Sequence, residues 1–210
     1  MQPALKVCGM ARPDNLRAVA ALRPDFLGLI FYPGSKRYAA PTLAPAEVAT
    51  LPAGIQKVGV FVDEEVAVIL ARVREYGLHL VQLHGAEPPE VCAALQRAGV
   101  AVIKAFAVGE AFDFASLLPY VGSVDYFLFD AAGSQPGGNG TTFNWEQLQR
   151  YNLPVPYFLA GGIGPEHAAE LRNLRLPGLF ALDLNSKFET APGVKDAEQL
   201  RQFFANVRIR

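Results

Sequence analysis

Short apolar runs alternate with amphipathic stretches along the whole chain. Each run is rich in Val, Ile, Leu and Phe and has the length of a strand that is buried on both faces. The runs cover residues 4–9, 26–31, 57–62, 78–83, 100–106, 125–129, 156–160 and 179–184. The stretches between and after them have the spacing and start signals of helices, at 13–22, 44–50, 64–76, 88–98, 114–121, 144–151, 165–173 and 196–207.

Eight strand–helix units in succession predict a closed (β/α)8 barrel of the α/β class, a TIM barrel. The alternative is an open doubly wound sheet, but the chain lacks the Gly-x-Gly-x-x-Gly that usually follows the first strand of that fold. No low-complexity or charged linker interrupts residues 1–210, so we expect a single domain. In such a barrel the chemistry lies where strands end and the following loops begin.

Composition narrows the class of protein and of partner. The 210 residues are 51% hydrophobic and 19% charged, which excludes a disordered chain. Nineteen basic against twenty acidic residues argue against a nucleic-acid-binding surface but leave room for a small phosphate site. Two cysteines form no disulfide framework, and the sequence lacks the run of about 18 apolar residues that a membrane span requires. The first residues have neither a basic segment nor a long apolar one, so we expect no signal peptide. We therefore expect a cytoplasmic protein with no membrane partner.

The ends of the first and sixth predicted strands carry the candidates for acid–base chemistry. Lys6 and Cys8 share one face of the first strand, so the lysine lies where it would lower the pKa of the thiol. Asp130 follows an apolar run directly, a place where a carboxylate usually has a specific purpose. The alternatives are a small buried cysteine and a helix-capping carboxylate. A glycine-rich segment, 131–143, follows Asp130 and has the composition of a loop that closes over a ligand.

Polar residues also end the second and fourth predicted strands. Lys36 and Arg37 follow the second strand and suit an anionic ligand, although loop charges are often merely solvated. Gln82 and His84 share a face that is opposite to their apolar neighbours, which indicates the mouth of the barrel. They form a weak metal site, because no second His or Asp lies nearby in the sequence, and a structural histidine is the better interpretation of His84.

The ends of the seventh and eighth strands predict a phosphate site. Gly161, Gly162 and Ile163 lie at the junction with a predicted helix, where backbone N–H groups bind anions. Ser186 and Lys187 follow the eighth strand and add a hydroxyl and a cation. In barrels, phosphates often lie between these two loops, whereas a Gly-Gly pair alone indicates only close helix–strand packing.

Together these residues resemble the phosphoribosylanthranilate isomerase family, the barrel enzymes of tryptophan biosynthesis. The matching segments follow one another in order from the first strand to the last helix. They are 6–9, 31–33, Ser35, 37–38, 58–62, 81–85, Gly137, Gly138, Gly140, Phe143, Trp145, 160–162, Asp183, Ser186, Glu189, Pro192, Gly193, Lys195 and Asp196.

The resemblance implies an Amadori rearrangement of N-(5′-phosphoribosyl)anthranilate to a carboxyphenylamino-deoxyribulose phosphate, with no metal and no cofactor. The family's acid maps onto Asp130, which would protonate the ribose ring oxygen, and its base onto Cys8, which would remove the proton from sugar carbon 2. Arg37 would clamp the anthranilate carboxylate. Three further polar residues are assigned to substrate contacts: Gln82, His84 and Asp183. The oligomeric state stays open between monomer and homodimer.

The sequence departs from the family pattern after the eighth strand. Lys187 stands where the family usually has a glycine, and a positive φ there would be costly for lysine. Either the loop follows another path or the ammonium supplements the phosphate site. Two other functions remain as alternatives: another phosphosugar isomerase barrel, such as the Amadori isomerase of histidine synthesis, and a barrel that binds a phosphorylated ligand without converting it. The first alternative requires a carboxylate at the position of Cys8.

Overall fold

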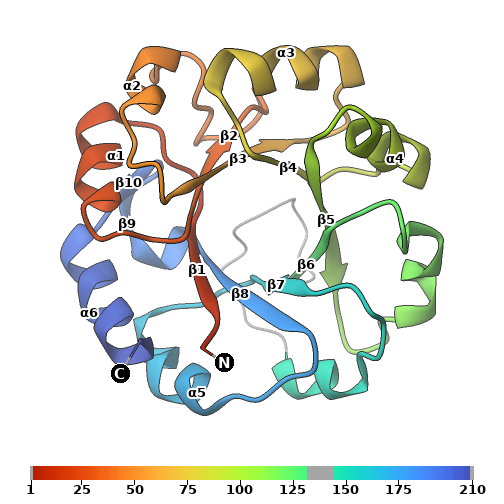
Figure 1. Ribbon diagram of the computed structural model, residues 1–210. Helices are drawn as coiled ribbons and strands as arrows, with labels where there is room; N and C mark the ends of the chain where they lie inside the picture. Colours follow the sequence, from red (N-terminus) through yellow and green to blue (C-terminus); the bar gives the residue numbers. More distant parts are fainter. Residues whose placement is uncertain (1, 132–143, 209–210) are drawn as a thin grey trace.

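Eight parallel strands close into a barrel in the order β1 to β8 in the computed structural model, which describes residues 2–131 and 144–208. Figure 1 shows the ring of strands with the helices outside it. The predicted barrel is therefore confirmed and the open sheet is excluded. The strands are β1 Ala4–Val7, β2 Phe26–Ile30, β3 Gln56–Phe61, β4 Leu80–Leu83, β5 Ala101–Val108, β6 Tyr126–Ala131, β7 Tyr157–Leu159 and β8 Leu179–Leu184.

Helices cover most of the outside of the barrel and begin at the signals that the sequence provides. Proline occupies an early position of α1, α2 and α4, where its missing N–H is not needed. Gly77 ends α3 in the left-handed conformation, and Asp196 caps α6 by accepting from the Gln199 backbone N–H. The helices are α1 Pro13–Ala20, α2 Pro45–Ala49, α3 Val66–Tyr76, α4 Pro89–Arg97, α5 Ala168–Asn173 and α6 Ala197–Val207. No described helix is long and apolar enough to cross a membrane.

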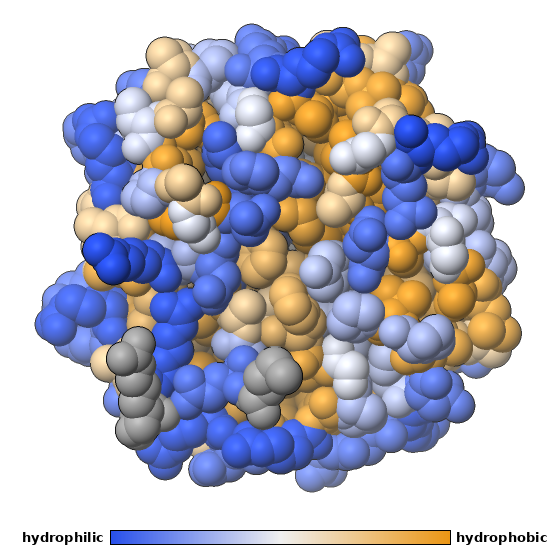
Figure 2. Space-filling model, viewed as in Figure 1, coloured by the Kyte–Doolittle hydropathy of each residue, from blue (hydrophilic) through white to orange (hydrophobic). Residues whose placement is uncertain are grey.

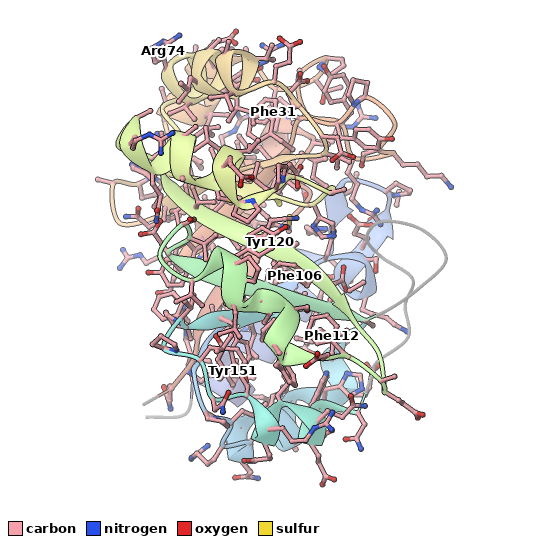
Figure 3. All side chains as sticks on the ribbon, turned by 90° about the vertical axis from the view of Figure 1, so that its right-hand side faces the viewer. Phe31, Arg74, Phe106, Phe112, Tyr120 and Tyr151 are labelled. Carbon is pink, nitrogen blue, oxygen red and sulfur yellow. The ribbon has the colours of Figure 1, made fainter. Side chains whose placement is uncertain are left out.

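Two of the predicted helices are 3₁₀ segments instead. The first, η1, spans Phe114–Tyr120 and contains Pro119, which cannot donate a helical hydrogen bond; the second, η2, spans Trp145–Arg150. Aromatic rings cover the strands here, and Phe106 contacts Tyr120 edge-on at 5.1 Å between ring centroids (Figure 3). The helix expected at 165–173 is also divided, into η3 Pro165–His167 and α5.

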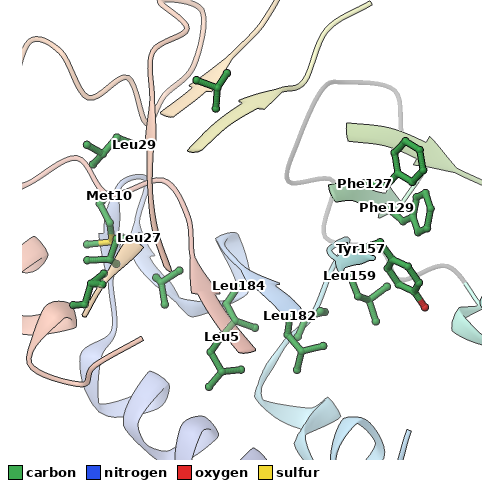
Figure 4. Packing of buried hydrophobic residues seen from close by; sticks show 14 of the residues in the cluster. Leu5, Met10, Leu27, Leu29, Phe127, Phe129, Tyr157, Leu159, Leu182 and Leu184 are labelled. Carbon is green, nitrogen blue, oxygen red and sulfur yellow. The ribbon is translucent and has the colours of Figure 1, made fainter. Parts of the chain in front are cut away.

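The core has two layers. Inward-facing side chains, among them Phe26, Leu128 and Phe158, fill the inside of the barrel, and Figure 2 shows the middle of the ring closed by side chains rather than open as a pore. Outward-facing side chains pack under the helices, as Leu5, Leu182 and other labelled residues do in Figure 4. Both faces of the strands are thus buried, which explains their nearly continuous apolar sequence.

A short hairpin after β8 is absent from the predicted elements. The chain leaves β8 through the 3₁₀ turn η4, Ser186–Phe188, and then pairs β9, Glu189–Ala191, with β10, Val194–Lys195. Asn15 on α1 holds this hairpin, because its side chain donates to the Lys195 carbonyl at 2.8 Å and accepts from the Lys195 N–H at 2.8 Å. Strands this short carry too little periodicity to be recognised in a sequence.

Replacing Phe158 by alanine tests the inner core. The side chain is 0% exposed and packs edge-on against Phe26 at 5.2 Å, so its loss leaves a cavity inside the barrel. We expect Phe158→Ala to lower the free energy of unfolding by about 3–5 kcal/mol, measured by urea denaturation. Leu118→Ala is the control, because Leu118 is 56% exposed and its truncation changes stability by less than about 0.5 kcal/mol. Equal losses in the two variants would contradict a packed barrel interior.

Candidate active site

A cavity of about 610 Å³ lies among the ends of the strands and the loops that follow them. Ten of the eleven residues that the sequence assigns to the site line it. They are Cys8, Arg37, Gln82, His84, Asp130, Gly161, Gly162, Ile163, Asp183 and Ser186. Lys187 is exposed on η4 and does not line it. The glycine-rich segment 131–143 that follows Asp130 lies, beyond Ala131, outside the described residues.

A buried ammonium group lies behind three residues that line the cavity: Cys8, Gln82 and Asp183. Lys6 is 0% exposed and donates to Gln82 Oε1 at 2.7 Å and to Asp183 Oδ2 at 2.9 Å. It also lies close enough to Cys8 to interact with the thiol. The three side chains come from three strands. Lys6 on β1 is paired in register with Asp183 on β8, and Gln82 reaches them from β4 across the barrel interior.

Burial governs the ionisation of this cluster. It works against the charge of Lys6, but the carboxylate of Asp183, with Cys8, raises the pKa of the lysine overall, so the ammonium form persists. Burial raises the pKa of Cys8 even though Lys6 and Lys195 act to lower it. The expectation that Lys6 opposes protonation of the thiol is therefore right in sign, but burial outweighs it. Burial also raises the pKa of Asp183 against the opposing effect of Lys6.

The polar groups continue from Lys6 to the opposite wall of the cavity. Gln82 Nε2 lies 2.9 Å from His84 Nδ1, and His84 Nε2 lies 3.6 Å from Asp130 Oδ2. Asp130 is the penultimate residue of β6, and its Oδ1 accepts from the Ala131 N–H at 2.9 Å. The candidate base and acid therefore lie at the two ends of one row of neighbouring polar side chains, in which the contact between His84 and Asp130 is longer than a hydrogen bond.

Two glycines make space around the reacting groups. A Cβ on Gly28 would lie 2.7 Å from the Cys8 sulfur, so the missing side chain on β2 leaves room for the thiol. Gly161 has a φ of +83°, and a Cβ there would lie 2.4 Å from the Ala131 nitrogen. Any side chain at Gly161 would therefore push the loop after β7 away from the strand that carries Asp130. The sequence gives no sign of the role of Gly28, because its neighbour in space comes from another strand.

Arg37 is held by a carboxylate from the hairpin after β8. Its Nε lies 2.8 Å from Glu189 Oε1 and its Nη2 lies 2.7 Å from Glu189 Oε2, a two-pronged contact. Nη1 has no hydrogen-bond partner among the described residues, and Arg37 lines the cavity. One side of the guanidinium is thus fixed while the other stays available to an anion.

A second buried lysine supports this contact. Lys195 Nζ, which is inaccessible to solvent, donates to Glu189 Oε1 and to Asn185 Oδ1, both at 2.6 Å. Burial lowers the pKa of Lys195, whereas burial of Glu189 is outweighed by its bonds to Arg37 and Lys195, which hold its pKa below the usual range. Glu189 and Lys195 appear in the sequence only as part of the family pattern, and their role depends on the hairpin geometry.

Backbone N–H groups gather at the side of the cavity formed by the loops after β7 and β8. Gly161 and Gly162 have φ values of +83° and +68°. The N–H groups of Gly161, Gly162, Ile163 and Ser186 have no acceptor among the residues that the structure describes. Such an array suits an anion. Lys187 is not among the described residues with positive φ, so the lysine stands there without the backbone strain that a positive φ would bring.

The part of the chain that the structure describes contains no group of three or more His, Cys, Asp or Glu side chains placed to hold a metal ion. Three titratable side chains lie near one another in the cavity: His84, Asp130 and Asp183. Their arrangement suits hydrogen bonding and proton transfer to a ligand in the cavity.

The family described as N-(5′phosphoribosyl)anthranilate (PRA) isomerase matches residues 5–206. A relative named N-(5′-phosphoribosyl)anthranilate isomerase from Phocaeicola vulgatus is 42% identical over 204 residues, covering 97% of both chains. The solved phosphoribosyl anthranilate isomerase of Thermotoga maritima superimposes with a TM-score of 0.85 at 32% identity and covers 98% of each chain. A further structure, at 29% identity, a TM-score of 0.79 and 98% coverage of each chain, is an isomerase in complex with reduced 1-(o-carboxyphenylamino)-1-deoxyribulose 5-phosphate.

Replacing Glu189 by glutamine tests the support of Arg37. The change leaves two cations, one of them fully buried, without their shared counter-charge, so we expect Glu189→Gln to lower the free energy of unfolding by about 3 kcal/mol in urea denaturation. Glu198→Gln is the matched control, since it removes a carboxylate from an exposed pair with Arg201 on α6. The control should unfold at the wild-type urea concentration. If Glu189→Gln also unfolded at the wild-type urea concentration, the ion pairs of Glu189 with Arg37 and Lys195 would not stabilise the fold.

Proposed function

Because the chain belongs to the N-(5′-phosphoribosyl)anthranilate isomerase family, and so catalyses that isomerisation in tryptophan biosynthesis, we propose that Cys8 is its base and Asp130 its acid. One observation carries the assignment. The thiol, directly after β1, and the carboxyl group, on β6, line the same cavity, with an anion-binding group at each side of it. The substrate itself carries a carboxylate at one end and a phosphate at the other.

Asp130 acts first, on the closed sugar. Its carboxyl group gives a proton to the ribose ring oxygen, the bond between that oxygen and carbon 1 breaks, and the nitrogen lone pair forms the iminium ion. The iminium ion is the electron sink for the next step, so neither a metal nor an organic cofactor is required. Asp130 is left as a carboxylate that accepts from the Ala131 N–H at 2.9 Å and faces His84.

Cys8 acts second, on the open chain. As the thiolate it takes the proton from carbon 2, and the electron pair of that C–H bond neutralises the iminium ion to give an enolamine. Tautomerisation of the enolamine, with loss of the hydroxyl proton and protonation of carbon 1, yields the ketone. Burial disfavours the thiolate, and Lys6 and Lys195 supply the positive charge that partly offsets this. Each turnover leaves one proton on Cys8 and removes one from Asp130, so the enzyme must return a proton to the acid.

The two anionic ends of the substrate fit the two sides of the cavity. The free edge of Arg37 binds the anthranilate carboxylate. The phosphate binds the N–H groups of Gly161, Gly162 and Ile163 and those of Ser186 and Lys187. Support comes from the fixed guanidinium and from the unpaired backbone donors. In this arrangement Lys187 contributes through its backbone, and its ammonium remains at the rim.

Polar groups at the ends of β4 and β8 complete the substrate side of the cavity in this proposal: His84 and Asp183 contact the sugar, and Gln82, which the sequence assigns to the same contacts, supports His84 from behind. Asp183 is the clearest of them, because its Oδ1 is buried and has no hydrogen-bond partner among the described residues. Sugar hydroxyls are donors of the kind that such an oxygen requires. His84 is partly exposed in the cavity, whereas Gln82 is only 1% exposed.

The relatives and the composition support a proposal for the ligand, the oligomeric state and the cellular compartment. The ligand is a small phosphorylated molecule, as in the relative solved with a reduced product analogue. One solved relative from Thermotoga maritima is described as dimeric, and monomers have been generated from it. We infer a monomer or a homodimer for this chain, without a nucleic-acid or membrane partner. Two free thiols, Cys8 and Cys92, fit a cytoplasmic biosynthetic enzyme.

Turnover of phosphoribosylanthranilate, followed by its fluorescence, tests the assignment of acid and base. We expect Cys8→Ala and Asp130→Asn each to lower kcat by a factor of about 10³ or more, because each removes a proton transfer that no neighbouring group supplies. A chelator should leave wild-type turnover unchanged. Near-normal kcat in either variant would reject that residue's role.

Two further variants serve as controls in the same assay. Arg37→Ala should raise KM with little change in kcat, because the arginine binds the substrate without taking part in proton transfer. Cys92→Ser should retain wild-type kinetics, since Cys92 is fully buried on α4 and does not line the cavity. A large loss of kcat in Cys92→Ser would mean that effects of thiol replacement are structural.

A further inference from the structure

Along the contacts from Lys6 through Gln82 to His84, donors and acceptors can be assigned in only one way. An ammonium group has no acceptor, so the atom of Gln82 that lies 2.7 Å from Lys6 Nζ must be the amide oxygen. The amide NH2 then faces His84, 2.9 Å from Nδ1. Because NH2 only donates, Nδ1 must be the unprotonated, accepting nitrogen of the ring. The single proton of the neutral imidazole therefore sits on Nε2.

We propose that Lys6 and Gln82 fix His84 in the Nε2–H tautomer, and that this tautomer directs the proton of Asp130 toward the substrate. Gln82 is the positioning residue in this scheme. It is 1% exposed and both ends of its amide are engaged by protein groups, so it acts on the reaction through His84. The proposal rests on the acid role of Asp130 proposed above.

The tautomer matters because of what Nε2 faces. Asp130 Oδ2 lies 3.6 Å away, and Oδ1 is already occupied by the Ala131 N–H. A bare Nε2 would offer a lone pair to the acidic proton and compete for it with the ribose ring oxygen. A protonated Nε2 cannot accept that proton, and once the proton has moved to the sugar a shortening of the 3.6 Å contact by a few tenths of an ångström lets Nε2 donate to the carboxylate left behind. Hydrogen bonds to charged groups are among the stronger ones in proteins.

Nitrogen-15 NMR of protein labelled in its histidine rings reads the tautomer directly. The chain has three histidines, and two of them are internal references. His79 Nδ1 accepts from the Lys57 N–H, and His167 Nδ1 accepts from the Gly164 N–H, each at 2.9 Å. At alkaline pH, where all rings are neutral, we expect all three to give an unprotonated Nδ1 and a protonated Nε2. A His84→Asn variant assigns the third pair of signals.

Gln82→Glu replaces the hydrogen-bond donor that faces His84 Nδ1 by an acceptor, in a side chain of nearly the same shape. A carboxylate still accepts from Lys6, but it also accepts from the ring, so the His84 proton moves to Nδ1 while the His79 and His167 signals stay in place. We expect kcat to fall by about tenfold to a hundredfold with KM changed by less than about twofold, since a charged hydrogen bond to the acid is lost while Arg37 and the phosphate-binding loops are unaltered. Gln199→Glu adds the same charge on α6, outside the cavity, and should keep wild-type kinetics.

Each outcome supports or overturns the proposal. A wild-type His84 with its proton on Nδ1, or a mixture of tautomers, overturns it without any variant, so failure of Gln82→Glu to fold does not leave it untested. A shifted tautomer with unchanged kcat overturns the link to catalysis. If Asp130→Asn retains activity, the acid assignment fails, yet the ring spectrum still decides the tautomer. Unprotonated Nδ1 in the wild type, with the paired change in spectrum and kcat in Gln82→Glu, supports it.

Discussion

The buried ammonium of Lys6 is the interaction on which the site depends. It neutralises Asp183, fixes the amide of Gln82 and partly offsets the burial of Cys8, and no solvent reaches it. Removing one member of a buried ion pair typically costs about 3–5 kcal/mol, because the remaining charge has no counter-ion. One side chain of β1 therefore influences both the base beside it and, through Gln82 and His84, the acid on β6.

A second network, centred on Glu189, orients the substrate rather than the protons. Glu189 holds Arg37 and Lys195 and comes from a hairpin that is tied to α1 through Asn15. The barrel brings the two networks together because the ends of β1, β2, β4, β6 and β8 meet around one cavity. The fold thus separates recognition of the substrate's ends from chemistry at its centre.

The sequence predicts the barrel well because parallel strands that are buried on both faces have nearly continuous apolar sequences. The run at 179–184, for example, matches β8 residue for residue. It overestimates the helices after β5 and β6, where Pro119 and aromatic packing produce 3₁₀ segments. Strand-end positions identify ten of the cavity residues. The partner of Arg37 lies 152 residues away, so its contact depends on the closed barrel and has no local signal. The sequence also does not show whether the pKa of Cys8 is raised or lowered, because burial outweighs the nearby lysines and burial depends on the fold.

The most direct test of the role of Lys6 is the pH dependence of Cys8 alkylation by iodoacetamide in a Cys92→Ser background, where Cys8 is the sole thiol. Only the thiolate reacts, so the midpoint of the rate profile reports the pKa of Cys8. Burial places that midpoint above the value of a free cysteine, and loss of the ammonium in Lys6→Met moves it higher still. A midpoint that is unchanged or lower in Lys6→Met would contradict control of the thiol by Lys6.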